Sequence, residues 1–289
     1  MTSVFRLLVL LGVSSGVIRA EPPLTPLEIS GSEVHVYRQI GDAELRLHVV
    51  YPDGWTAADS RPCVVAFFSG GWSSGTPERS MKWVKWAAEN GFVGIAPDYR
   101  TRERFGGTPE DCVSDARAAM RWLQSHADDL GIDVSKIIVQ GSSAGGHLAA
   151  WTAIPKYQDE DIILPESIPA ALILVCPVTD TKETGYGGPK RFGGDVERAF
   201  ASSIPDNLPE KMPPTIIFHA TGDPTVPYVN SADLRDRMIL NGSSCRLVTF
   251  EGLGHAYFAR SKFGDKAIAA DKKTYEEAKG FLARLGLAK

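Results

Sequence analysis

One serine stands in a sequence context suited to nucleophilic catalysis. Ser143 is the middle residue of Gly-Ser-Ser-Ala-Gly at residues 141–145, which follows the apolar run 137–139 and precedes the small-residue stretch 146–150. This order predicts a strand, a sharp turn and a helix, which together present a serine at a helix N-terminus. The simpler alternative is that the two serines only cap the helix. The flanking strand and helix favour the catalytic interpretation.

A serine hydroxyl is a weak nucleophile at neutral pH, so it needs a base and a group that orients that base. Asp223 and His255 each follow an expected strand, and the order Ser, Asp, His is expected for a nucleophile on a strand-to-helix turn. Asp180, after another expected strand, is a rival for the acid. We therefore predict a triad of Ser143, His255 and Asp223.

Acyl transfer also needs N–H donors that stabilise the oxyanion. The backbone N–H of Ala144, directly after the nucleophile, is one candidate. Gly70 and Gly71 follow the apolar run 62–68, and glycine lets a backbone turn its N–H groups toward a substrate. Trp72 comes next, where it either lines the pocket or packs against its surroundings. The sequence predicts an oxyanion hole formed by Gly70, Gly71 and Ala144.

Apolar runs alternate with amphipathic stretches, which predicts an α/β fold with a mostly parallel sheet and helices on both faces. The expected parallel strands are 62–68, 92–97, 137–140, 171–176, 215–220 and 246–250. The expected helices are 79–90, 108–126, the helix after Ser143, 230–241 and 266–287. Polar and apolar residues alternate in 33–38 and 44–49, which indicates an antiparallel N-terminal hairpin with one face in solvent.

The other five histidines are expected to be structural. His35 and His48 are assigned to the solvent face of the hairpin, His147 to packing or hydrogen bonding, and His126 and His219 to structural positions. The four cysteines form no Cys-x-x-Cys pair, so they are either disulfide-bonded in one of three pairings or buried as free thiols. Neither cysteine nor histidine falls at metal-ligand spacing, and we expect no metal and no cofactor.

The first twenty residues have the pattern of a secretory signal. Arg6 precedes the apolar run 7–18, and Ala20 offers a small residue for cleavage. We expect a mature chain of residues 21–289 that is a single catalytic domain, secreted or periplasmic and without stable membrane insertion. The alternative, an uncleaved anchor, is disfavoured by the charge and prolines after the apolar run. Residues 179–212 are rich in Gly and Pro and are expected to form a lid or insertion over the strand ends.

The overall composition is that of an ordinary globular protein, with 43% hydrophobic and 23% charged residues. The formal net charge of −4 gives no reason to expect nucleic acid or anionic lipid as a partner.

From about residue 34 to its C-terminus, the chain resembles the α/β-hydrolase superfamily. The stretch Phe68-Ser69-Gly70-Gly71-Trp72 resembles the His-Gly-Gly-Gly-Trp motif of carboxylesterases of the hormone-sensitive-lipase and feruloyl or acetylxylan esterase-like groups. Residues 97–100 and 141–147 resemble their other signatures. The resemblance implies Ser143 as nucleophile, Asp223 as acid, His255 as base, and Gly70, Gly71 and Ala144 as oxyanion donors. Phe68 and Ser69 depart from the motif's His and first Gly, which leaves the loop conformation and the fit of the substrate open.

The expected activity is hydrolysis of carboxylic esters through an acyl-enzyme. The substrate is a small-molecule or polysaccharide ester, with acetyl or feruloyl esters of polysaccharides favoured by the resemblance and by export. Candidate substrate contacts are Trp72, Arg100 and Tyr257, although Arg100 and its charged neighbours at 102–104 also suit a solvated ion-pair face. Two alternatives are a serine peptidase of the prolyl-oligopeptidase type and a non-catalytic binding protein on a hydrolase scaffold.

Overall fold

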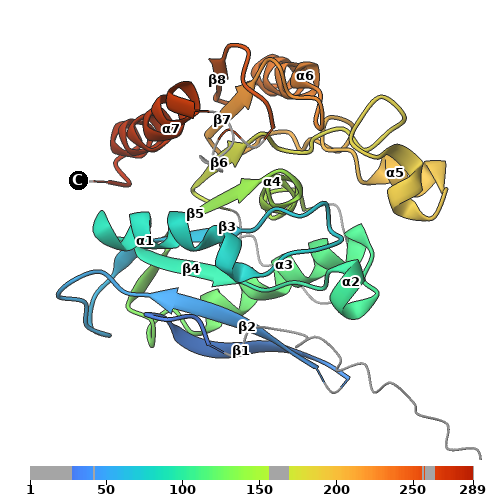
Figure 1. Cartoon of the computed structure of the whole chain (residues 1–289). Coiled ribbons are helices and arrows are strands. Elements are labelled where there is room, and N and C mark those ends of the chain that lie inside the picture. Colours follow the sequence, from blue (N-terminus) through green and yellow to red (C-terminus); the bar gives the residue numbers. More distant parts are fainter. Residues whose placement is uncertain (1–27, 42, 156–168, 256, 258–263, 289) are drawn as a thin grey trace, which may run out of the picture.

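An eight-stranded sheet forms the centre of the molecule (Figure 1). The structure is a computed structural model that describes residues 28–41, 43–155, 169–255, 257 and 264–288. The predicted signal segment 1–20 therefore lies outside the described residues. The strand order is β1-β2-β4-β3-β5-β6-β7-β8. The pairs β1/β2 and β2/β4 are antiparallel, and every other neighbouring pair is parallel.

The strands are β1 (Glu33–Ile40), β2 (Ala43–Val50), β3 (Arg61–Phe67), β4 (Val93–Pro97), β5 (Ile132–Ser142), β6 (Ala171–Val175), β7 (Thr215–Ala220) and β8 (Cys245–Phe250). The helices are α1 (Met81–Glu89), α2 (Arg102–Phe105), α3 (Pro109–Ser125), α4 (Ala144–Trp151), α5 (Val196–Ala201), α6 (Tyr228–Leu240) and α7 (Gly264–Arg284), with 3₁₀ turns η1 (Pro77–Ser80) and η3 (Gly188–Phe192). The predicted α/β class, with its antiparallel hairpin and otherwise parallel sheet, is confirmed.

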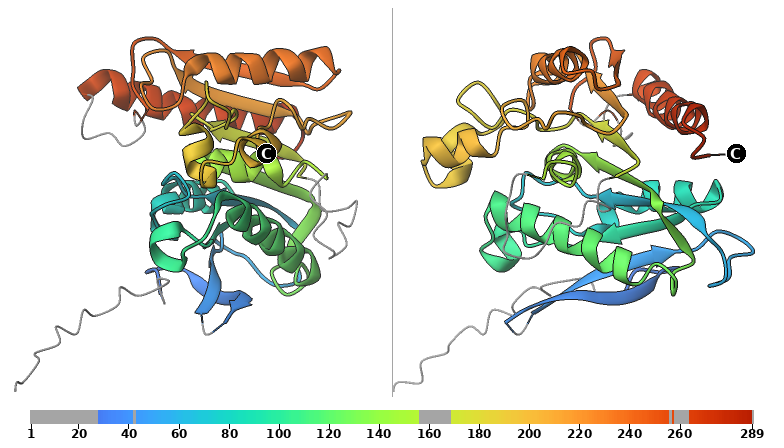
Figure 2. Two further views of the ribbon diagram at one scale, coloured as in Figure 1. Left: turned by 90° about the vertical axis from the view of Figure 1, so that its right-hand side faces the viewer. Right: turned by 180° about the vertical axis from the view of Figure 1, so that it is seen from behind.

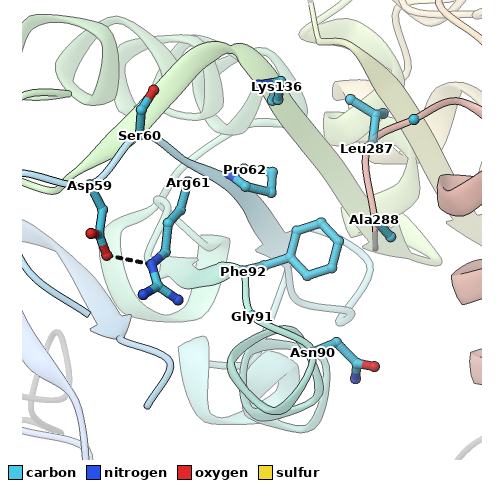
Figure 3. A pocket seen from close by; sticks show the side chains of 11 residues that line it. Asp59, Ser60, Arg61, Pro62, Asn90, Gly91, Phe92, Lys136, Leu287 and Ala288 are labelled. Atoms are coloured by element: carbon cyan, nitrogen blue, oxygen red, sulfur yellow. Dashed lines mark hydrogen bonds and ion pairs between the residues drawn. The ribbon is translucent and has the colours of Figure 1, made fainter. Parts of the chain in front are cut away.

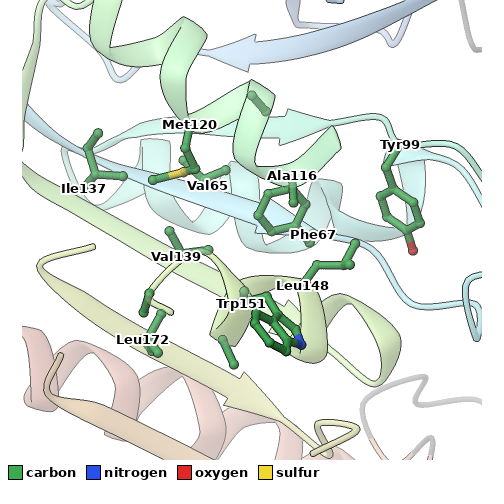
Figure 4. Close-up of a cluster of buried hydrophobic side chains, with 14 of the residues drawn as sticks. Val65, Phe67, Tyr99, Ala116, Met120, Ile137, Val139, Leu148, Trp151 and Leu172 are labelled. Carbon is green, nitrogen blue, oxygen red and sulfur yellow. The ribbon is translucent and has the colours of Figure 1, made fainter. Parts of the chain in front are cut away.

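Side chains alternate across the sheet, so each central strand contributes to two cores. Val65 and Phe67 face the core that includes side chains of α3 and α4, as the close-up of this cluster shows (Figure 4). Helix α6 contributes Leu234 and Met238 to the same core. Val64 and Ala66 face the other core, against α1 and α7. The views from the side and from behind show helices on both sides of the twisted sheet (Figure 2). This double burial explains why the central strands are continuously apolar.

The local signals for helix α3 are realised as predicted. Thr108 is the N-cap, and its hydroxyl accepts from the N–H of Asp111 while that carboxylate accepts from the N–H of Thr108. Pro109 occupies the first helical position, where its missing N–H costs nothing.

The hairpin forms at the predicted position, but the prediction that His48 faces solvent is wrong. His48 is fully buried, because α1 packs over that face of β2. Burial, with a contribution from Arg46, lowers the pKa of His48 to about 4. Only part of the predicted wet face of the hairpin therefore reaches solvent.

A cavity of about 490 Å³ opens at the amino-terminal end of the parallel strands (Figure 3). Arg61, Phe92 and Lys136 line it together with the C-terminal residues Leu287 and Ala288. Parallel sheets bind ligands at the carboxyl ends of their strands. The candidate active site therefore lies at the opposite edge from this cavity. None of the described helices is both long and apolar enough to cross a membrane.

Candidate active site

Ser143 lies at the junction of β5 and α4 in a strained backbone conformation. Its φ is +55°, in a region that side-chain-bearing residues rarely adopt. The turn fits only because Gly141 and Gly145 lack side chains: a Cβ at Gly141 would lie 2.0 Å from the carbonyl oxygen of Gly145. A Cβ at Gly145 would lie 2.2 Å from the carbonyl oxygen of Phe67. The turn thus holds Ser143 at the N-cap of α4.

The structure brings the three residues of the predicted triad together. Nε2 of His255 lies 2.9 Å from Oγ of Ser143, and Nδ1 of His255 lies 2.7 Å from Oδ2 of Asp223. The residues arrive from the carboxyl ends of β5, β7 and β8. An ionised carboxylate only accepts hydrogen bonds, so Nδ1 carries the hydrogen of the neutral imidazole and Nε2 faces the serine hydroxyl. In this arrangement His255 can take the proton of Ser143.

The carboxylate of Asp223 is buried and, among the described residues, accepts four hydrogen bonds from nitrogen donors. Oδ1 accepts from the N–H groups of Thr225 at 2.8 Å and Val226 at 2.9 Å. Oδ2 accepts from His255 and, at 3.1 Å, from Nε2 of His219. Burial alone raises the pKa of Asp223, but the hydrogen bonds from His219, His255 and Val226 outweigh it and hold this pKa well below its usual range. The acid of the triad is therefore ionised.

The rival acid, Asp180, is engaged elsewhere. Its Oδ1 accepts from the N–H of Lys182 at 2.8 Å, and its Oδ2 accepts from the hydroxyl of Thr184 at 3.1 Å. These short-range bonds are those of an Asp-stabilised turn. Only the folded loops distinguish Asp223 from Asp180, since both follow a strand.

Residues 68–74 are called the oxyanion loop below. In this loop the carbonyl oxygens of Ser69 and Gly70 are held by hydrogen bonds, so the N–H groups of Gly70 and Gly71 point the other way. Arg79 donates to the carbonyl oxygen of Ser69 at 3.1 Å, and the amides three and four residues after Gly70 donate to its carbonyl oxygen. A trans peptide directs its N–H opposite to its C=O. Within the described residues, neither glycine N–H donates a hydrogen bond.

The third predicted donor, the N–H of Ala144, belongs to the first residue of α4. Such an N–H has no acceptor inside its own helix. The contact between Gly145 and the carbonyls of Phe67 and Phe68 brings the oxyanion loop beside the turn that carries Ser143. The three predicted donors are thus gathered around one edge of the sheet.

Two residues of the segment 179–212, Tyr186 and Arg191, hold the oxyanion loop in place. The sequence analysis did not identify either of them. Nη1 of Arg191 donates to Oγ of Ser73 at 2.6 Å, and Nη2 donates to the hydroxyl of Tyr186 at 2.9 Å. That hydroxyl packs so closely on Gly71 that a Cβ there would approach it to 2.5 Å. The segment also pairs Arg198 with Glu110 at 2.7 Å. It is therefore attached both to the oxyanion loop and to α3.

Two of the predicted substrate contacts, Arg100 and Tyr257, have partners within the protein. Arg100 pairs with Asp115 at 2.8 Å and with Asp111 at 3.0 Å, so α3 neutralises its charge. Tyr257 is fully buried, with its ring on Phe250 and its hydroxyl 3.0 Å from that of Thr274.

Trp72 packs rather than lining an open pocket. Its side chain is buried, and its ring lies edge-on to His147 at 5.0 Å between centroids. Tyr186 and Phe192, both from residues 179–212, lie near the same ring. Trp72 therefore fills the space between the oxyanion loop, α4 and this segment.

One group of described side chains has metal-ligand proximity: ligand atoms of Cys176, Asp223 and His255 lie within 4.8 Å of one another. Burial and the nearby Asp223 charge raise the pKa of the Cys176 thiol well above its usual value. A neutral thiol is a poor metal ligand, and the other two side chains already bond to each other. All four cysteines are free, which settles the question between disulfides and thiols.

The chain is similar to proteins that are known esterases. The BD-FAE family model matches residues 48–170. The propionate-bound structure of esterase 2 from Thermogutta terrifontis is 35% identical, has a TM-score of 0.80, and covers 94% of this chain and 98% of its own. Structures of that esterase have also been solved with butyrate bound and after phosphorylation by paraoxon.

Two relatives from Mycobacterium tuberculosis are similar in sequence. Esterase LipC is 25% identical over 231 residues, which are 71% of this chain and 56% of LipC. Carboxylesterase NlhH is 31% identical over 118 residues, which are 39% of this chain and 34% of NlhH. The chain thus spans about half the length of LipC and about a third of NlhH.

The fold and the strand-to-helix serine turn define the class as an α/β hydrolase. With the esterase similarity over nearly the whole chain, the protein belongs to the carboxylesterases of this superfamily, of the type related to hormone-sensitive lipase.

Proposed function

We propose that the protein is a serine esterase that hydrolyses carboxylic esters through an acyl-enzyme. The observation that carries the proposal is the continuous hydrogen-bonded chain from Oγ of Ser143 through His255 to Asp223. The matched proteins named as esterases support it.

The reaction follows from the geometry of these groups. His255 takes the hydroxyl proton of Ser143 as Oγ attacks the ester carbonyl carbon, and the ester C=O becomes an oxyanion. The N–H groups of Gly70, Gly71 and Ala144 stabilise that charge. His255 then protonates the leaving alcohol as the C–O bond breaks. A water molecule, deprotonated by His255, attacks the acyl-enzyme, and Ser143 recovers its proton as the acid leaves.

For the substrate, we propose acetyl or feruloyl esters of polysaccharides, handled outside the cytoplasm. The BD-FAE match and the signal-like residues 1–20 support this assignment. Propionate and butyrate bound to the Thermogutta terrifontis esterase support a short acyl group. Expression of the full chain in a bacterium with an outer membrane should give a mature N-terminus near Glu21 outside the cytoplasm. An intact N-terminus in the cytoplasm would refute the export proposal.

The deciding experiment compares ester hydrolysis by the purified protein, its Ser143→Ala variant and its Ser142→Ala variant. We expect turnover of p-nitrophenyl acetate and butyrate above octanoate, with methyl ferulate and acetylated xylan tested in parallel. Ser143→Ala should abolish turnover, whereas Ser142→Ala, one residue earlier, should retain it. Paraoxon should add one diethylphosphoryl group, and peptide mapping should locate it on Ser143.

Two outcomes would contradict the proposal. One is a folded wild-type protein that is inert on every ester, in which case cleavage of Gly-Pro p-nitroanilide would favour the peptidase alternative. The other is an unchanged rate for Ser143→Ala.

A further inference from the structure

A second imidazole contacts the same carboxylate oxygen as the catalytic histidine. His219 lies on β7, four residues before Asp223, and both side chains are fully buried. Nε2 of His219 lies 3.1 Å from Oδ2 of Asp223, and Nδ1 of His255 lies 2.7 Å from that same oxygen. Asp223 therefore bridges two histidines, only one of which faces the nucleophile.

The surroundings of His219 determine which of its nitrogens carries hydrogen. Nε2 also lies 3.1 Å from the carbonyl oxygen of Val226. A carbonyl oxygen and an ionised carboxylate both accept only, so Nε2 must be the donor. Nδ1 lies 2.7 Å from the hydroxyl of Ser231 on α6, and in the neutral ring it accepts the hydrogen of that hydroxyl. Ser231 is itself fully buried. Both ring nitrogens of His219 thus have defined partners.

We propose that His219 is a positioning residue of the triad. Its Nε2–H holds the Asp223 carboxylate in the orientation that meets His255, and supports the carboxylate charge while His255 gains and loses its proton. The consequence for catalysis rests on the proposed esterase function, whereas the hydrogen bond itself does not.

The proposal predicts how the Asp223–His255 pair titrates. When His255 is protonated, its positive charge stabilises the carboxylate; when His255 is neutral, the carboxylate depends more on the donor from His219. Removal of that donor destabilises the deprotonated pair more than the protonated pair, so the apparent pKa of the pair should rise.

Other titratable groups around the pair stay the same when His219 is replaced. In the described part of the chain, these are Cys176 after β6 and Tyr228 on α6. Burial, the Asp223 charge and a hydrogen bond to Asp223 raise the pKa of the Cys176 thiol, so this neutral thiol also contacts the carboxylate, and it is unchanged in every variant below. Tyr228 lies edge-on to the His219 ring at 5.7 Å, and its hydroxyl bonds to that of Thr249 at 2.7 Å. His219 is therefore the side chain, besides His255, that donates to Asp223 from a ring nitrogen.

The first test is ¹⁵N NMR of the wild-type protein, which requires neither a variant nor turnover. We expect His219 to be protonated at Nε2 and unprotonated at Nδ1 across the pH range in which His255 titrates. Its resonances should shift as His255 titrates, because both rings share Oδ2. A His219 that carries its hydrogen on Nδ1 alone would overturn the proposal.

The second test measures the titration of His255 in three variants. His219→Phe keeps a ring but removes the donor, and should raise the apparent pKa of His255 by about half a unit to one unit. His219→Gln places an amide N–H near the position of Nε2 and should restore most of the shift. Ser231→Ala is the matched control, because it removes the other hydrogen bond of His219 and leaves the donor to Asp223. Its His255 pKa should match the wild type.

Ester hydrolysis gives the third measurement. The acid limb of kcat/KM should move to higher pH in His219→Phe by the same amount, with kcat at neutral pH about tenfold lower and KM little changed. An unshifted limb in a folded His219→Phe protein, or an equal shift in Ser231→Ala, would overturn the proposal. If His219→Phe does not fold, the tautomer of His219 in the wild-type protein and the His255 titration in His219→Gln test the proposal instead. A wild-type protein without esterase activity would refute the proposed function, and the NMR titrations would still decide the role of His219.

Discussion

Nη1 of Arg191 lies 2.6 Å from Oγ of Ser73 and so connects two residues 118 positions apart in the chain. The same guanidinium donates to Tyr186, whose hydroxyl rests against Gly71. Within the described residues, the hydrogen-bond partners of Arg191 are all neutral oxygens, so its contacts serve to hold loops together. The position of the oxyanion loop thus depends on residues 179–212.

Replacement of Arg191 should therefore impair catalysis without touching the triad. Loss of an oxyanion donor typically costs about 10²–10³-fold in rate, and a displaced donor costs less. We expect Arg191→Ala to lower kcat on p-nitrophenyl butyrate about tenfold. Lys190→Ala, at the exposed neighbouring position, should stay within about twofold of wild type. Equal rates for the two variants would show that Arg191 does not position the loop.

Asp223→Asn should nearly abolish activity, because the amide favours the wrong tautomer of His255 and removes the charge that stabilises its protonated form. The corresponding change in a serine protease triad lowers kcat about 10⁴-fold. Asp180→Asn is the control, since its carboxylate bonds only within its own turn among the described residues. Steady-state kinetics of both variants should separate them by at least two orders of magnitude. A comparable loss in Asp180→Asn would contradict the assignment.

The same substitution should have opposite effects on stability at two glycines. At Gly145 a Cβ would lie 2.2 Å from the carbonyl oxygen of Phe67 and 2.5 Å from that of Phe68, so Gly145→Ala must displace backbone. We expect it to lower the free energy of unfolding by about 3 kcal/mol or more. At Gly280, near the C-terminal end of α7, a Cβ would meet only the flexible end of Arg284, at 3.5 Å. Gly280→Ala should therefore stabilise by about 0.5–1 kcal/mol, measured by urea denaturation.

Acid should destabilise the fold through two buried histidines. Burial lowers the pKa of His147 to about 4, and the pKa of His48 is also about 4. The unfolded chain binds these protons near pH 6.5, so both groups favour the folded state above that pH and progressively lose this contribution as pH falls to about 4. Each histidine contributes a slope of up to about 1.4 kcal/mol per pH unit in this window.

Urea denaturation at several pH values between 7 and 4 should show this decline. His147→Gln should reduce the slope by the share of one histidine, since glutamine does not titrate. An identical slope in the variant and in wild type would show that His147 is not the source.

Features that depend on residues close together in the chain could be predicted from the sequence. The cap of α3 needs only Thr108, Pro109 and Asp111, within one turn. The strained turn at Ser143 needs small residues two positions away on either side, and the sequence has glycine at both positions. Alternation and apolar runs predicted the sheet, because neighbouring side chains in a strand point to opposite faces. The order of the triad residues followed from the same elements.

Which distant side chains meet depends on how the chain folds. The fold placed Asp223 rather than Asp180 against His255, brought His219 to the same carboxylate, and turned Arg100 into the acids of α3. It also buried His48 under α1, where an alternating hairpin predicted solvent. Electrostatic and hydrogen-bonding partners act through space over a few ångströms. These partners therefore depend on how loops tens of residues apart fold back on one another. The sequence around each residue does not show which loops will meet.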